Sequence, residues 1–209
     1  MGISSWLVLA AGVIGVTGLA AAVRRREDEV APPEFAPPRR GFSGAVIYSF
    51  SLAFAPWIKE SARRHLIAYL AGVVFHVAAF AAVVVAVAST VPALNADEPR
   101  PLVAALFGAG LAAGLGLFAR RVAEAQLRQL SVPDDFVANL LVSGLLATAT
   151  AAALQPHLIE AQRVAAAVLL LYLPVGKLRH MVFLVISRWR VARTMGRRGV
   201  LGAAGVRQR

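Results

Sequence analysis

Five long runs of apolar residues, separated by polar and charged connections, set the pattern of this chain. The runs cover residues 4–23, 65–91, 101–119, 136–154 and 164–186. Each is close to the ~20 residues that a helix needs to cross the hydrocarbon core of a bilayer. Because a backbone group cannot stay unpaired in lipid, runs of this length predict helices. The pattern therefore predicts an all-α membrane protein, a bundle of five transmembrane helices.

The basic residues orient this bundle. Twenty of the 22 Lys and Arg residues lie in alternate connections, namely 24–64, 120–128 and the stretch from 177 to 209. By the positive-inside rule these connections are cytoplasmic, which places the N-terminus outside and the C-terminus in the cytoplasm. The net charge of +11 then reflects orientation, so we expect membrane lipid and not nucleic acid as a partner.

Composition divides the chain into three regions. Residues 1–40 hold the first transmembrane helix and a Pro-rich cytoplasmic linker at 31–38, and residues 188–209 form a basic cytoplasmic tail. Residues 41–187 form a bundle of four transmembrane helices plus an interfacial or re-entrant piece at 42–57, which is too short to span.

Two local patterns predict features of the bundle. Gly110-x-x-x-Gly114 has the spacing of close helix contacts, and tight packing is favoured there over a groove for a cofactor. Pro174 lies inside the fifth run and lacks the amide N–H that a helix needs, so we expect a kink.

Histidines carry the candidate chemistry. His65 and His76 are eleven residues apart, so on one helix they share a face within ~20° and lie ~16 Å apart along the axis. By the predicted orientation, His65 and His180 lie near the cytoplasmic surface, and His76 and His157 lie nearer the outside. An imidazole in or beside lipid is costly unless something binds it. Two pairs at two depths therefore favour two haem groups with bis-histidine ligation between facing helices.

Each histidine also has a plainer interpretation. His65 and His180 adjoin basic residues and fit an interfacial position, and His76 fits a packing role. His157 fits the predicted depth of the outer pair least well. It lies 23 residues before His180, a rise of ~34 Å in a continuous helix. The chain has no cysteine, which excludes a thiolate-held iron–sulfur cluster and a C-x-x-C-H haem attachment in this chain.

Two segments around these histidines resemble a known family. The chain resembles the gamma subunit of respiratory nitrate reductase and its wider cytochrome b family, which includes membrane subunits of heterodisulfide-reductase-like and sulfite-reductase-linked complexes. The resemblance covers about residues 48–198. It is carried by Pro56-Trp57-Ile58-Lys59-Glu60-Ser61-Ala62-Arg63 with His65, Gly72 and His76, and by Leu173-Pro174-Val175-Gly176-Lys177-Leu178-Arg179-His180.

The resemblance implies a function. Members of that family hold two b-type haems between their second and fifth helices, in a bacterial or archaeal cytoplasmic membrane. They take electrons from menaquinol or ubiquinol near the outer haem and pass them from the inner haem to a cytoplasmic iron–sulfur subunit. Carried over, His65 and His180 would ligate the inner haem and His76 the outer one. The tail 188–209 would then dock the soluble partner.

The chain also departs from the family. The fourth histidine of the family falls about where Gln162 stands, five residues after His157. Either His157 takes the role, or the outer haem is absent or differently ligated. The lysine of the family's quinone site has no clear counterpart, and Arg100 and Asp97 are the charged residues near that surface. A cofactor-free membrane anchor or assembly subunit remains the alternative, and the lack of mid-span carboxylates disfavours a transporter.

Overall fold

The structure is a computed structural model that describes residues 2–27, 43–58, 60–94 and 98–199. The Pro-rich linker, Lys59, Asp97 and most of the predicted tail's second half lie outside the described residues. Within the described ranges every regular element is a helix, as the apolar runs predict.

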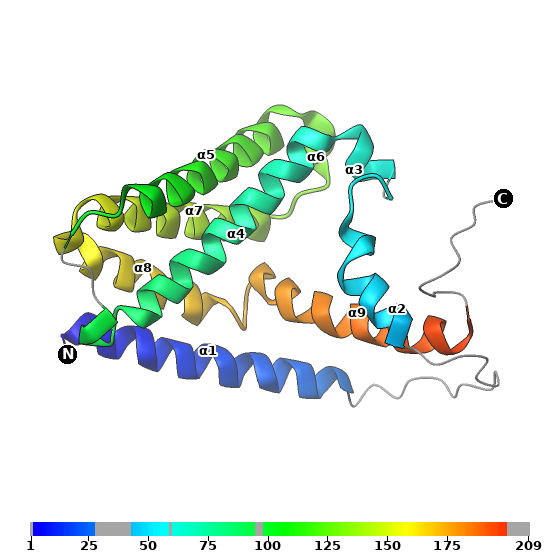
Figure 1. Cartoon of the computed structure of the whole chain (residues 1–209), viewed down its shortest axis with the longest axis horizontal. Coiled ribbons are helices and arrows are strands. Elements are labelled where there is room, and N and C mark those ends of the chain that lie inside the picture. The colour runs from blue at the N-terminus through cyan, green and yellow to red at the C-terminus, as the bar shows by residue number, and fades with distance from the viewer. Residues whose placement is uncertain (1, 28–42, 59, 95–97, 200–209) are drawn as a thin grey trace. The chain divides into compact units, whose positions relative to one another are not determined.

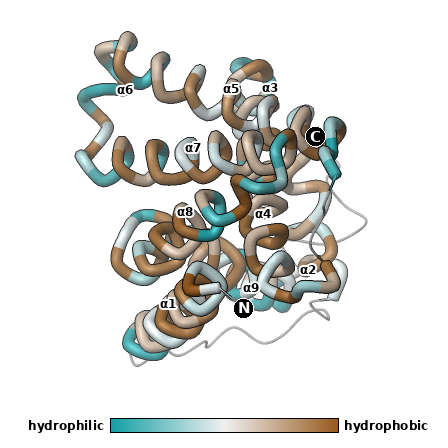
Figure 2. The backbone as a smooth tube through the Cα atoms, turned by 90° about the vertical axis from the view of Figure 1, so that its left-hand side faces the viewer, coloured by the Kyte–Doolittle hydropathy of each residue, from teal (hydrophilic) through white to brown (hydrophobic). Residues whose placement is uncertain are grey.

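Four helices are long and apolar enough to cross a membrane. They are α1 (Ile3–Glu27), α4 (Leu66–Ala88), α5 (Pro101–Ala123) and α7 (Pro133–Leu154). The count rises to five if α8 (Ile159–Tyr172) and α9 (His180–Arg197) are taken as one broken span. Hydrophobic colour predominates along α4, α5 and α7, and hydrophilic colour gathers around the short α6 (Ala125–Gln129) (Figure 2). The all-helical class is confirmed, with four or five helices long and apolar enough to span a membrane, whereas the exact number of spans and the orientation of the termini stay predictions.

The fifth apolar run differs from the single kinked helix that we expected. α8 starts earlier than predicted, at Ile159, and ends at Tyr172, two residues before Pro174. A turn and the 3-10 helix η4 (Lys177–Arg179) follow, and α9 begins at His180. Because proline cannot donate to the preceding turn and clashes with it, the helix stops here instead of bending.

The chain forms two compact units. Unit 1 comprises Met1–Ala22 and Ile67–Arg179, and unit 2 comprises Val23–Leu66 and His180–Arg209. Unit 2 contains α2 (Ser43–Phe50), the 3-10 helix η1 (Leu52–Phe54), α3 (Glu60–Arg64) and α9, and α2 packs against α9. The apolar segment Ser43–Phe54 is too short to span, in agreement with an interfacial or re-entrant piece.

Small residues bring the helices of unit 1 close together. One face of α4 carries Phe75, Ala78 and Ala82, which are buried in a core shared with α5, α7 and α8. A Cβ atom added to Gly110 would lie 2.3 Å from the Cβ of Ala78, and one added to Gly114 would lie 2.3 Å from the ring of Phe75. The predicted close contact at Gly110-x-x-x-Gly114 is therefore confirmed, and it is packing between α4 and α5.

The start of α7 agrees with its sequence signals. Pro133 is the first helical residue, and the carboxylate of Asp135 accepts a hydrogen bond from the backbone N–H of Val132 at 3.0 Å. Asp134 and Asp135 place negative charge on the positive end of the helix dipole. α5 and α7 lie side by side (Figure 1), so this start lies next to the end of α5.

Candidate functional site

Two adjacent polar residues of α8 are buried and tie it to α4. Gln162 is only 1% exposed, and its side-chain Nε2 donates a hydrogen bond to the backbone oxygen of Ala82 at 2.9 Å. Polar groups removed from water need such partners, since an unpaired one costs about 1–3 kcal/mol. The amide of Gln162 thus fixes the level at which α8 crosses α4.

Arg163 makes the second tie. It is 5% exposed, and its Nε donates to the hydroxyl oxygen of Ser89 at 3.0 Å, while a terminal nitrogen donates to the backbone oxygen of Ser89. Its other terminal nitrogen lies 3.8 Å from a carboxylate oxygen of Glu160. Ser89 directly follows α4, so the guanidinium stands at the negative end of that helix dipole, where a cation is favoured.

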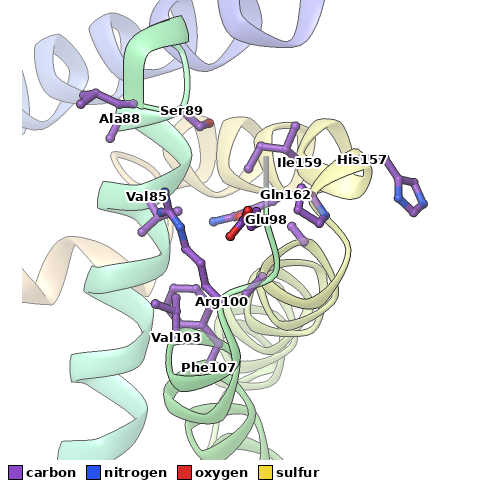
Figure 3. A pocket seen from close by; sticks show the side chains of 14 residues that line it. Val85, Ala88, Ser89, Glu98, Arg100, Val103, Phe107, His157, Ile159 and Gln162 are labelled. Atoms are coloured by element: carbon purple, nitrogen blue, oxygen red, sulfur yellow. The ribbon is translucent and has the colours of Figure 1, made fainter. Parts of the chain in front are cut away.

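A cavity of about 410 Å³ opens beside these two residues, entirely within unit 1 (Figure 3). Its volume falls in the usual range of ligand pockets. Most of its wall is apolar, and its polar side chains include Gln162, Glu98 and Arg100, which point toward the same space in Figure 3. The full lining comprises Val85, Ala88, Ser89, Leu94, Glu98, Arg100, Val103, Phe107, Ala152, Ala153, Pro156, His157, Ile159 and Gln162.

Arg100 owes its place to the start of α5. It is the residue that precedes the helix, with Pro101 at the first helical position. Its backbone N–H donates to the backbone oxygen of Ala153 at 2.7 Å, which joins the start of α5 to the end of α7. The guanidinium of Arg100 is exposed and projects toward Val85 (Figure 3). A charged side chain at the edge of an apolar cavity can bind a polar head whose body fills the cavity.

His157 borders the cavity but does not face it. It belongs to the 3-10 helix η3 (Pro156–Leu158), its side chain is exposed, and its ring is turned away from the other labelled side chains (Figure 3). Because Ala88 lines the same cavity, His157 lies at the level of the end of α4. His76 is twelve residues before Ala88 on α4, a rise of ~18 Å. The structure therefore does not bring His76 and His157 together, and one haem iron could not bind both.

His76 lies on an exposed side of α4. Its neighbour Phe75 is buried with Ala78 and Ala82, whereas the His76 ring is exposed, with Nδ1 2.7 Å from the backbone oxygen of Gly72. The rings of His76 and Phe75 meet edge to face, 6.0 Å between centroids. The face of α4 that meets α8 carries small aliphatic side chains instead of an imidazole. The residues between α4 and α8 therefore do not fit a haem at this level.

His65 and His180 both belong to unit 2. His65 occupies the single-residue break between α3 and α4, and His180 is the first residue of α9. Both side chains are exposed. The predicted pair thus stands at two helix starts within one compact unit, next to the basic side chains of Arg64 and Arg179.

A polar cluster at the other end of unit 1 was not predicted as a unit. The carboxylate of Asp135 lies 2.6 Å from Nζ of Lys177 and 3.3 Å from a terminal nitrogen of Arg121. The hydroxyl of Tyr172 donates to the carboxylate of Asp134. The sequence marks the two acids as a helix start, but nothing local in it indicates that their partners lie on α5 and beyond the end of α8.

Among the described residues no group of three or more His, Cys, Asp or Glu side chains could hold a metal ion. Comparison with family models, curated proteins and solved structures finds no match to this chain. The features of this chain that bear on function are therefore the histidines, the cavity and the two polar ends of unit 1.

Proposed function

We propose that this chain is a haem b-carrying membrane subunit of a multi-subunit oxidoreductase, which moves electrons between a membrane quinone and an iron–sulfur partner subunit. The observation that carries the proposal is the placement of His65 and His180. Although they are far apart in the chain, both stand at helix starts of the same compact unit with exposed imidazoles.

Basic residues adjoin both histidines in the sequence. Arg63 and Arg64 precede His65 and Arg179 precedes His180, so guanidinium groups are at hand for the two propionates. Haem b held by two imidazoles supplies one-electron transfer and leaves no coordination position open. The chain's own contribution is to hold both rings and to neutralise the propionate charge. Since the residues between α4 and α8 do not fit a second haem, the proposal includes one haem, and the His76–His157 site stays outside it.

The cavity in unit 1 supports the quinone half of the proposal. A quinone has a flat apolar body and polar oxygens, and the cavity offers apolar walls from Val85, Val103 and Phe107 with a donor from Arg100. Oxidation of a quinol releases protons with its electrons, and the carboxylate of Glu98 on the same wall can accept a proton.

A second candidate is a cofactor-free membrane anchor or assembly subunit. The tight aliphatic packing of α4 favours this alternative. Ala78, Ala82 and Ala86 are fully buried, and the amide of Gln162 already donates a hydrogen bond to the backbone oxygen of Ala82. In this alternative the histidines are interfacial or packing residues.

An absorption spectrum of the purified chain, oxidised and then reduced with dithionite, separates the two candidates. The proposal predicts a b-type band at one haem per chain, absent in His65→Ala and in His180→Ala and kept in His157→Ala, which serves as the matched control. A chain without a b-type band under conditions that supply haem would remove the proposal. A band that survives in both His65→Ala and His180→Ala would remove the ligand pair.

A further inference from the structure

α9 carries its arginines on two different sides. Arg188 is half-buried in unit 2, with its guanidinium carbon 5.1 Å from the centre of the Phe54 ring. Arg190, Arg193 and Arg197 are exposed, and at 100° per residue they fall within ~60° of one another. Ala192 and Gly196, which are buried, lie on a side of α9 away from Arg190. The three exposed arginines therefore form a basic stripe on the outward side of the helix.

A groove of about 250 Å³ runs beside this stripe within unit 2. Its floor is apolar, from Val23, Phe183, Ile186 and Val191, and Ser187 and Arg190 supply its polar groups. An apolar floor with a guanidinium and a hydroxyl at its edge matches a molecule that has a hydrocarbon chain and an anionic head. Neither a soluble anion nor a purely apolar chain uses both halves of it.

The level of the groove in the bilayer follows from α1. The spanning part of α1 covers Ile3–Arg25, so Val23 lies in its last turn, where the chain leaves the hydrocarbon region. Arg24 and Arg25 follow directly and are exposed. The groove is therefore at the depth of lipid headgroups, with basic residues on both of the elements that line it.

We propose that this groove binds an anionic phospholipid, with the phosphate on Arg190 and Arg193 and an acyl chain along Phe183 and Ile186. The basic charge of this surface and its depth in the bilayer favour a lipid over an acidic protein. The arginines lie beside an apolar floor that an acyl chain would cover and that a soluble acidic partner would leave exposed. The proposal does not depend on the haem, since none of these residues ligates it.

Trp189 provides a local probe of this site. It is 46% exposed and lies one turn before Arg193. The full chain, with Trp6→Phe and Trp57→Phe, is placed in nanodiscs that contain a minority of phosphatidylglycerol in phosphatidylcholine. Bromine is carried on the acyl chains of one lipid or of the other, and the quenching of Trp189 is measured per bromine. We expect brominated phosphatidylglycerol to quench at least about threefold more strongly, and high salt to reduce the difference.

Two variants locate the effect. Arg190→Gln with Arg193→Gln should abolish the preference, and Val191→Phe should weaken it by filling the groove while all charges stay. Arg120→Gln with Arg128→Gln removes the same charge from α5 and α6 and should leave the preference unchanged. Equal quenching by the two brominated lipids, in the chain that keeps Arg190 and Arg193, overturns the proposal. The arginines would then be assigned to contact with an acidic protein surface. An unchanged preference in Arg190→Gln with Arg193→Gln also overturns it.

Discussion

Unit 1 has polar side chains at both of its ends, and the two ends use them differently. Where α5 ends and α7 begins, acidic side chains have side-chain partners. The carboxylate of Asp135 pairs with Lys177 and Arg121, and the carboxylate of Asp134 accepts a hydrogen bond from the hydroxyl of Tyr172. Where α4 ends and α5 begins, the buried Arg163 is paired largely with the backbone and hydroxyl of Ser89. There a cavity of about 410 Å³ remains, with Glu98 and Arg100 on its wall.

The difference separates a closed end from an open one. At the closed end the side chains of Tyr172 and Lys177 hold the break between α8 and η4 against the start of α7. Gly176 contributes to this, because a Cβ atom there would lie 2.1 Å from the ring of Tyr172. At the open end the buried side chains of Gln162 and Arg163 hold α8 against α4. Other polar side chains there, those of Glu98 and Arg100, line the cavity, where a ligand can reach them. The closed end thus has ion pairs, whereas the open end combines buried contacts that hold α8 to α4 with a cavity that we propose as a ligand site.

The largest effect on stability is expected from Arg163→Ala. It removes the donors that satisfy Ser89 at a buried site, and we expect a loss of about 2–4 kcal/mol in the free energy of unfolding. Unfolding by SDS in mixed micelles measures it. Arg25→Ala, on an exposed arginine, is the control and should cost less than about 0.5 kcal/mol. A similar small cost for both would show that the buried guanidinium does not hold α8 to α4.

A smaller effect is expected at the closed end, where the ion pair is only partly buried. Asp135→Ala removes the partner of Lys177 and Arg121 and the acceptor of the Val132 N–H, and we expect a loss of about 1–3 kcal/mol. A double-mutant cycle with Lys177→Met should give a coupling of about 0.5–2 kcal/mol.

The pair of Glu60 and Arg64 is the matched control for this cycle. Its side chains are 66% and 72% exposed, so solvent screens it and its coupling should stay below about 0.5 kcal/mol. Equal couplings in the two cycles would contradict the view that the closed end is held by its ion pairs.

The smallest stability effect concerns a single hydroxyl. Tyr172→Phe removes the hydrogen bond to Asp134 and keeps the ring over Gly176, so we expect a loss of about 1 kcal/mol. Phe136→Leu, on a ring of α7 that meets Phe118 edge to face at 5.8 Å between centroids, compares a lost packing contact with a lost hydrogen bond. Unfolding midpoints in the same micelles measure both, and an unchanged midpoint in Tyr172→Phe would show that the hydroxyl contributes nothing.

The sequence predicted the spans well because their signal is local. A run of ~20 apolar residues indicates a transmembrane helix without knowledge of its neighbours, and Gly110-x-x-x-Gly114 carried its packing role in its spacing. The break after Tyr172 was predicted only as a kink, because Pro174 shows where a helix is weakened and not how its chain continues.

Long-range contacts were beyond the sequence. Gln162 was marked only because a histidine stands there in the family that the chain resembles, and its bond to Ala82 joins residues from two separate helices. The same holds for Arg163 with Ser89 and for Asp135 with Lys177. The spacing of His65 and His76 predicted a common helix face, but His65 lies in the break before α4 and His76 is on an exposed side of it. The packed face of α4 carries Phe75, Ala78 and Ala82 instead.

The most direct test of the open end is the binding of a quinone to the purified chain. Ala153→Phe puts a large ring into the cavity, and Ala147→Phe makes the same change at an exposed position of the same helix. We predict that Ala153→Phe raises the dissociation constant of a quinone at least about tenfold relative to Ala147→Phe, while the helix content of the two variants is the same. Equal dissociation constants in the two variants would contradict the assignment of this cavity to the quinone.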